Sequence, residues 1–268
     1  MRAPLRTPTW MTSASGPAVR ATNPTVTPTT CSMVRGRDAV PGTGMKQVIT
    51  HPWALSEREA LDLQCRLATK VEREDRFGTI ECVAGVDVAH DELTDKLIAA
   101  AVVLDAVSLD VLEQTIAEDV ARFPYIPGLF SFRELPSVAQ ALHQLQLTPD
   151  LIVCDGQGIA HPRRFGLACH LGVLFDVPTI GCAKTLLCGE AGPVGFERGS
   201  SAPLVDNGEI IGSALRTQDG INPVYVSIGH RISLPSSREW ILRLCRKYRL
   251  PETTRQADRL VRAALSGK

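Results

Sequence analysis

The chain has 268 residues, of which 44% are hydrophobic, so it can bury a full core as a single domain. Its 29 basic and 29 acidic residues balance, which excludes a global positive field but leaves room for a local basic face that binds nucleic acid. The sequence has no run of about eighteen apolar residues, no secretory apolar region and no Cys-x-x-Cys pair among its eight cysteines, so we expect a cytoplasmic protein with free thiols and no membrane association.

The first 47 residues differ in composition from the rest. They are rich in Pro, Thr, Ala and Ser and contain one acid, Asp38. They show no sustained period, which predicts a disordered tail at 1–47 before a folded domain at 48–268. An organelle transit peptide, or an upstream start codon with Met45 as the natural beginning, stays open as an alternative.

The first helix is marked by a capping box. Ser56 and Glu59 are spaced so that each side chain can bond the other's backbone N–H. The helix that follows is predicted to place these residues on one face: Leu61, Cys65, Ala68 and Val71.

Three strand-like runs come next, with short polar connections that favour an antiparallel meander. They cover residues 82–89, 97–105 and 111–121. After a loop at 122–132 we expect a helix at 133–145. Since proline is tolerated only near the first turn of a helix, Pro136 places Glu134 at the N-terminal end.

The second half alternates between short strands and helices, which is typical of parallel strands joined by helical crossovers. The expected elements are a strand at 151–155, a helix at 166–176 and a strand at 178–184. A hairpin at 209–216 and 224–229 leads to two C-terminal helices, the first opened by a capping box from Ser236 to Glu239. The whole predicts a single-domain mixed α/β sheet with helices on both faces.

Three acids stand beside apolar strands. Asp87 lies in Val83-Ala84-Gly85-Val86-Asp87, where a bare carboxylate is costly unless paired or bound to a cation. Asp155 ends an apolar strand, at the edge where open α/β sheets bind ligands. Each acid alone is equally explained as a turn cap. Together with Glu134 they favour an oxygen-ligated Mg²⁺, or Mn²⁺ as a substitute, and hydrolysis of a phosphate ester.

Two other side chains can assist such chemistry. His230 ends an apolar strand, and as a neutral imidazole it can position or deprotonate the attacking water or complete the metal shell. Lys184 follows another strand and can steady the phosphate. A structural histidine and a solvated lysine are the competing interpretations.

A stiff loop and a basic pair suggest contact with a nucleic-acid strand. Tyr125 and Ile126 lie between Pro124 and Pro127, so the loop can form a rigid apolar wedge that parts stacked bases, or be an ordinary surface loop. Further on, His161-Pro162-Arg163-Arg164 provides two guanidinium groups suited to phosphate, a weak signal alone.

Together these segments resemble the endonuclease V family, the deoxyinosine 3′ endonucleases of the ribonuclease H-like superfold. The resemblance spans residues 56–264 and is most specific in the string from Pro149 to Gly166. Other matching strings are Val-Ala-Gly-Val-Asp-Val, Pro-Tyr-Ile-Pro-Gly, Ser-Phe-Arg-Glu, Val-Pro-Thr-Ile-Gly-Cys-Ala-Lys and Gly-His-Arg. One departure is Thr185-Leu186-Leu187 after Lys184, which lacks the usual Arg and puts a backbone contact in doubt.

The resemblance implies a role for each part of the site. Asp87, Glu134 and Asp155 would ligate Mg²⁺, with His230 as the fourth member of the site. Tyr125 would be the wedge, and the backbone at Gly156, Gly158 and neighbours through His161 would shape a pocket for flipped-out hypoxanthine.

The resemblance also implies the reaction. A monomer would bind deoxyinosine in single- or double-stranded DNA and hydrolyse the second phosphodiester bond 3′ to it, leaving 3′-hydroxyl and 5′-phosphate ends and starting repair of deaminated adenine. Three alternatives stay open: an endoribonuclease specific for inosine in RNA, a non-catalytic damage-binding protein, and an unrelated phosphohydrolase of small nucleotides.

Overall fold

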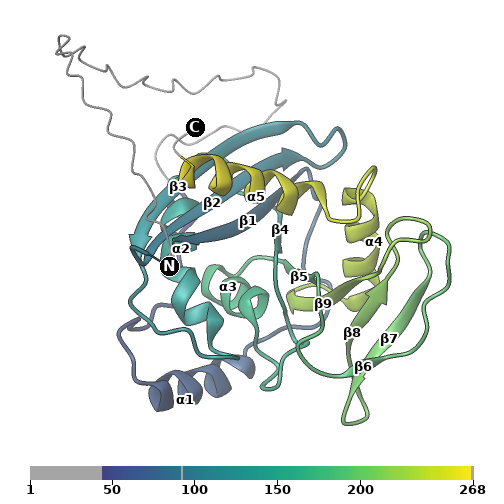
Figure 1. Cartoon of the computed structure of the whole chain (residues 1–268), viewed down its shortest axis with the longest axis horizontal. Helices are drawn as coiled ribbons and strands as arrows, with labels where there is room; N and C mark the ends of the chain where they lie inside the picture. Colours follow the sequence, from purple (N-terminus) through teal and green to yellow (C-terminus); the bar gives the residue numbers. More distant parts are fainter. Residues whose placement is uncertain (1–43, 92, 267–268) are drawn as a thin grey trace, which may run out of the picture. The chain divides into compact units, whose positions relative to one another are not determined.

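The computed structural model describes residues 44–91 and 93–266, so the predicted tail lies outside the described residues up to position 43. The described strands form one nine-stranded sheet in the order β3-β2-β1-β4-β5-β9-β8-β7-β6 (Figure 1). The strands are β1 Cys82–Asp91, β2 Lys96–Asp105, β3 Val111–Val120, β4 Leu151–Cys154, β5 Thr179–Ala183, β6 Glu190–Ala191, β7 Ser201–Asp206, β8 Glu209–Leu215 and β9 Val224–His230. The helices are α1 Glu57–Ala68, α2 Phe130–His143, α3 Leu167–Phe175, α4 Leu234–Leu244 and α5 Glu252–Leu265.

The sheet is mixed, as predicted. Strands β1, β2 and β3 pair antiparallel, whereas β1 and β4, and β4 and β5, pair parallel. Strand β9 then returns antiparallel to β5. The parallel ladder places the carboxyl ends of β1, β4 and β5 at one edge, where such sheets bind ligands.

Helices cover both faces of this sheet, because successive strand residues point to opposite sides. On one face Ala84 and Val86 pack with Leu135 of α2 and Leu171 of α3. On the other face Val83, Val153 and Ile180 pack with Ile241 of α4 and Ala257 of α5. The predicted mixed α/β sheet with helices on both faces is therefore confirmed.

Helix α5 approaches the sheet closely because β1 carries a glycine beneath it. A Cβ atom on Gly85 would lie 2.2 Å from the carbonyl oxygen of Thr253, in the first turn of α5. Only a residue without a side chain leaves room for that backbone contact. Gly85 and Asp87 share one face of β1, so the same contact brings α5 over Asp87.

Several local predictions were wrong for identifiable reasons. The buried face of α1 consists of Ala60, Leu63, Gln64 and Leu67, and Cys65 is exposed. The predicted face was offset because Gln64 is polar, yet its amide points inward and donates to the carbonyls of Gly128 and Phe165.

The starts of α2 and α4 also differ from the prediction. Helix α2 begins at Phe130 and carries Pro136 in its interior, so Glu134 lies in its second turn. Helix α4 is capped by Ser233, whose hydroxyl accepts from the Ser236 N–H, and the predicted box at Ser236 does not form. The hydroxyl of Ser236 donates instead to Asp75.

Residues that precede α1 pack onto the domain. Met45, which the sequence assigned to the tail, is buried in the core beside α2 and α3. The Val48 N–H donates to the carbonyl of Leu174 over 2.8 Å. These contacts extend the packed domain to residues before position 48.

The helices and cysteines of the described residues bear on two predictions made from the composition. None of the helices in the described residues combines the length and apolar character that a membrane span requires. Six cysteines in the described residues are free thiols: Cys65, Cys154, Cys169, Cys182, Cys188 and Cys245. Cys154, Cys169 and Cys182 are fully or almost fully buried, so they act as small hydrophobic residues.

Candidate active site

Two carboxylates lie side by side where the parallel ladder between β1 and β4 ends. The last paired residues are Val86 and Cys154, so Asp87 and Asp155 are the next residues on each strand. Neighbouring strands are about 4.8 Å apart, and laterally aligned residues of a parallel pair point to the same face. The structure therefore brings these two predicted acids together.

Glu134 and Asp258 approach the same point from opposite faces of the sheet. Glu134 comes from the second turn of α2, and its charge interacts with those of Asp87 and Asp155. Asp258 comes from α5, and its charge interacts with those of Asp87 and Lys184.

The position of α5 accounts for Asp258. From Thr253, which touches Gly85, five helical residues advance about 7.5 Å to Asp258. From Gly85 to Asp87, β1 advances about 6.7 Å. Asp258 thus lies level with Asp87. Sequence analysis missed Asp258, because its place beside the buried face of α5 does not by itself distinguish it from an ordinary solvated helix residue; that face consists of Thr253, Thr254, Ala257 and Val261.

Burial, together with the crowding of like charges, shifts the pKa of two of these acids. Burial, and then the charges of Asp155 and Asp258, raise the pKa of Asp87 to about 7. Burial, and then the charges of Asp87 and Asp155, raise the pKa of Glu134 well above its usual value. Acids that are held together in the low-dielectric interior, despite the electrostatic free energy that this costs, are typical of functional sites.

Lys184 supplies the nearest positive charge. Its Nζ lies 2.5 Å from Oδ2 of Asp155. Partial burial lowers the pKa of Lys184, but the bond to Asp155 and the neighbouring acids raise that pKa by more. The ammonium group therefore stays charged. Within residues 44–91 and 93–266, no group of three or more His, Cys, Asp or Glu side chains is placed so that it could hold a metal ion as the side chains stand. The four acids are a cluster of neighbours, with Asp155 turned to the lysine.

His230 lies at the opposite end of the strands from the acids, so its predicted place in the site is wrong. It pairs with Thr179 at the start of β5, whereas Lys184 follows the end of that strand, five residues or about 16 Å away. Its Nδ1 accepts from the Glu72 N–H, and its Nε2 lies 3.5 Å from Asp176 Oδ1. Burial lowers the pKa of His230. The ring is a buried structural group.

A small pocket of about 350 Å³ opens beside the acid cluster. The residues around it include Tyr125, Ile126, Pro127, Gly156, His161 and Leu186, as well as Asp155 and Lys184. Tyr125 is 69% exposed and meets Phe130 edge to face, so its ring stands at the rim. The volume and the apolar lining are typical of a site for a small planar ligand.

Gly158, which was predicted for this pocket, is placed elsewhere. Gly158 does not line it, because a Cβ there would lie 1.9 Å from the carbonyl oxygen of Ile228, and this glycine serves close packing against β9. Pro124, which was predicted as part of the wedge loop, is exposed and does not line the pocket. Gln157 does line the pocket: its Nε2 donates to the Thr185 carbonyl, and its buried Oε1 has no hydrogen-bond partner among residues 44–91 and 93–266.

The basic pair beside the pocket is engaged within the protein. Arg163 donates to Gln64 and to the Gly128 carbonyl, which holds the loop after Tyr125. Arg164 forms ion pairs with Asp206 and Glu209. Its guanidinium is therefore not available for a phosphate, contrary to the prediction. His161 has a pKa lowered to about 4 by burial and by Arg163, and its neutral ring also bonds the Gly128 carbonyl.

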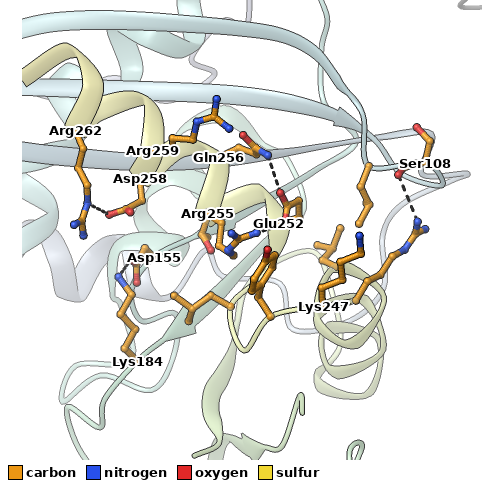
Figure 2. Close-up of a pocket in the computed structure, with 16 residues that line it drawn as sticks. Ser108, Asp155, Lys184, Lys247, Glu252, Arg255, Gln256, Asp258, Arg259 and Arg262 are labelled. Atoms are coloured by element: carbon orange, nitrogen blue, oxygen red, sulfur yellow. Dashed lines mark hydrogen bonds and ion pairs between the residues drawn. The ribbon is translucent and has the colours of Figure 1, made fainter. Parts of the chain in front are cut away.

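A larger basic groove of about 900 Å³ starts from the same acids and runs along α5 (Figure 2). Asp155 and Lys184 border both this groove and the small pocket. Its cationic lining residues are Lys184, Arg246, Lys247, Arg255, Arg259 and Arg262. The acid cluster therefore lies between a pocket of base-like size and a positively charged channel.

Comparison with known proteins assigns the family. The family model for endonuclease V matches residues 65–259. The chain belongs to the endonuclease V family. Endonuclease V of Nocardia farcinica is 52% identical over 219 residues, covering 81% of this chain and 95% of that relative. Members of the endonuclease V family are nucleases, so the chain is an enzyme of that class.

Solved endonuclease V structures share the fold. The crystal structure from Streptomyces avermitilis has a TM-score of 0.78 and 48% identity, covering 84% of this chain and 99% of that one. The structure from Ciona intestinalis, solved with a 24mer DNA containing an inosine followed by a ribo-adenosine, has a TM-score of 0.70 and 25% identity, covering 78% and 98%. The ribonuclease H-like mixed sheet predicted from the sequence is the sheet of this family.

Proposed function

We propose that this protein is a divalent-metal-dependent DNA repair endonuclease. It recognises deoxyinosine and hydrolyses the second phosphodiester bond 3′ to the lesion, leaving 3′-hydroxyl and 5′-phosphate ends. One observation carries the proposal: in a chain of the endonuclease V family, four carboxylates gather between a pocket of base-like size and a basic groove.

The donor groups suit a hard cation. Asp87, Glu134, Asp155 and Asp258 offer only oxygen atoms, which Mg²⁺ and Mn²⁺ prefer over nitrogen and sulfur. Burial is the main cause that raises the pKa of Asp87, and the repulsion from Asp155 and Asp258 that adds to it is the field that a divalent cation would neutralise. When bound, the ion supplies an activated water and neutralises charge on the leaving oxygen. We propose all four as its ligands.

Lys184 is proposed to position the reacting phosphate. Its ammonium group is charged, borders both cavities and lies against Asp155. If Asp155 served as a metal ligand, Lys184 Nζ would be free to contact a phosphate at the junction of the two cavities. A positive charge there attracts the phosphate and stabilises negative charge in the transition state.

The small pocket is proposed to hold the extruded base, with Tyr125 as the wedge. Its ring is exposed at the rim, and Gly128 at φ +80° with Pro127 fixes the loop that carries it. Hypoxanthine carries an N1–H donor that adenine lacks, and Gln157 Oε1 is an acceptor in the pocket wall that has no partner within the described part of the chain. Reading a flipped base by its Watson–Crick edge is the usual source of such selectivity.

Inosine in RNA is the second candidate substrate. The Ciona relative was solved with a ribonucleotide directly after the inosine, which favours testing ribose at that position. The catalytic groups would be the same, and only the contacts to the sugar would differ.

The test uses an end-labelled duplex with one inosine, incubated with Mg²⁺ or with chelator. We expect a single nick at the second bond 3′ to the inosine, lost with chelator. Replacing the 3′ deoxyribose by ribose compares the two substrates directly. A protein that binds the duplex but never nicks it would instead be a damage-binding protein, and no binding would reject the proposal.

A further inference from the structure

We propose that the basic groove along α5 binds the part of the strand 3′ to the cleaved bond, and that a base of that part stacks on Tyr248. This inference rests on the proposed function and adds a second binding element to it, on the opposite side of the acids from the small pocket.

Tyr248 is held as a platform. The guanidinium carbon of Arg255 lies 3.4 Å from the centre of the Tyr248 ring, so it covers one face of that ring. Arg255 is itself fixed by Glu252, with Nη1 and Oε2 2.5 Å apart. The ring remains 51% exposed within the groove lining. An aromatic ring backed by a cation in a basic groove is the arrangement on which bases stack in single-strand sites.

The groove also has cationic side chains that are available to bind phosphates. It is lined by six cationic and three anionic residues, the latter being Asp155, Glu252 and Asp258. Arg255 and Arg262 are paired with acids, but Lys247 and Arg259 are exposed and have no hydrogen-bond or ion-pair partner among the described residues. Free cations along a channel bind a phosphate backbone without regard to sequence.

The direction of the strand follows from where the cavities meet. If the lesion base occupies the small pocket, the strand must reach the acids through the junction at Asp155 and Lys184. Because the cleaved bond lies 3′ to the lesion, the nucleotides beyond it continue away from the pocket. The groove starts at that junction and is larger than the pocket, so it receives the 3′ segment.

The experiment compares two inosine substrates that differ only in their 3′ arm. One ends at the second nucleotide after the inosine, and the other continues for eight nucleotides. The readout is the ratio of kcat/KM for the long arm to kcat/KM for the short arm. We expect Tyr248→Ala to lower this ratio about tenfold, as loss of one stacked base does. Tyr248→Phe, which keeps the ring, should retain it.

Two further variants make the result decisive. Phe196→Ala removes an aromatic that is 72% exposed and lies outside both cavities, and it should retain the wild-type ratio. Lys247→Glu removes a free cation without touching the core, so it still tests whether the groove binds the 3′ segment if Tyr248→Ala fails to fold. It should lower the same ratio and flatten the salt dependence of long-arm binding.

An unchanged ratio in both Tyr248→Ala and Lys247→Glu would overturn the inference while leaving the proposed function intact. Absence of nicking by the wild-type protein on either substrate would instead reject the proposed function.

Discussion

Asp87→Asn should make the metal-free protein more stable while removing its activity. The pKa of Asp87 rises from 3.8 to about 7, so the folded state holds a proton that the unfolded state releases between these values. This carboxylate therefore lowers stability as the pH rises from about 4 to 7. At about 1.4 kcal/mol per pH unit, the cost above pH 7 is about 4 kcal/mol. Asparagine has nearly the same shape and does not ionise.

Urea unfolding with chelator present, at pH 8 and at pH 5, measures the effect. We expect Asp87→Asn to gain about 2–4 kcal/mol at pH 8 and about two-fifths of that at pH 5. Asp62→Asn, at an exposed site of α1, is the matched control and should change little at either pH. Added Mg²⁺ should stabilise the wild type but not Asp87→Asn. A variant that is no more stable at pH 8, or gains equally at both values, refutes the reasoning.

Asp258→Asn should abolish Mg²⁺-dependent nicking. His230→Asn should retain nicking in proportion to the fraction of folded protein. Equal loss of nicking in both variants would show that His230 belongs to the active site. Gly85→Ala should cost about 1–3 kcal/mol in unfolding experiments, because the new methyl group meets the α5 backbone, and unchanged stability would contradict that contact. Tyr125→Ala should reduce discrimination between inosine and undamaged duplex more than it weakens Mn²⁺ binding, and undiminished discrimination would exclude the wedge.

Much of the sheet and two of the acids followed from local sequence signals. The meander and the parallel strands are encoded in apolar runs, and Asp87 and Asp155 stand within or directly after such runs, a pattern that depends only on near neighbours. The start of α2 was placed too late because Pro136 was taken as a first-turn residue. The packing around that helix outweighs the hydrogen bond that proline removes.

The fourth acid and the histidine could not be assigned without the tertiary arrangement. Asp258 lies four residues before Arg262 and pairs with it, which in sequence is typical of a solvated helix face. Only the approach of α5 over Gly85 turns it toward the cluster. His230 ends a strand as Asp155 follows one, but β9 runs antiparallel to β5, so the two ends lie at opposite edges.

The central proposal is that acids from β1, α2, the end of β4 and α5 bind one divalent ion together. Crystals of the protein grown with Mn²⁺ and measured at the manganese absorption edge would locate that ion by its anomalous scattering. We expect a peak bonded to the carboxylates of Asp87 and Asp155, with Glu134 and Asp258 around it and Lys184 turned away from Asp155. Manganese bound elsewhere, with Lys184 still on Asp155, would contradict the proposal.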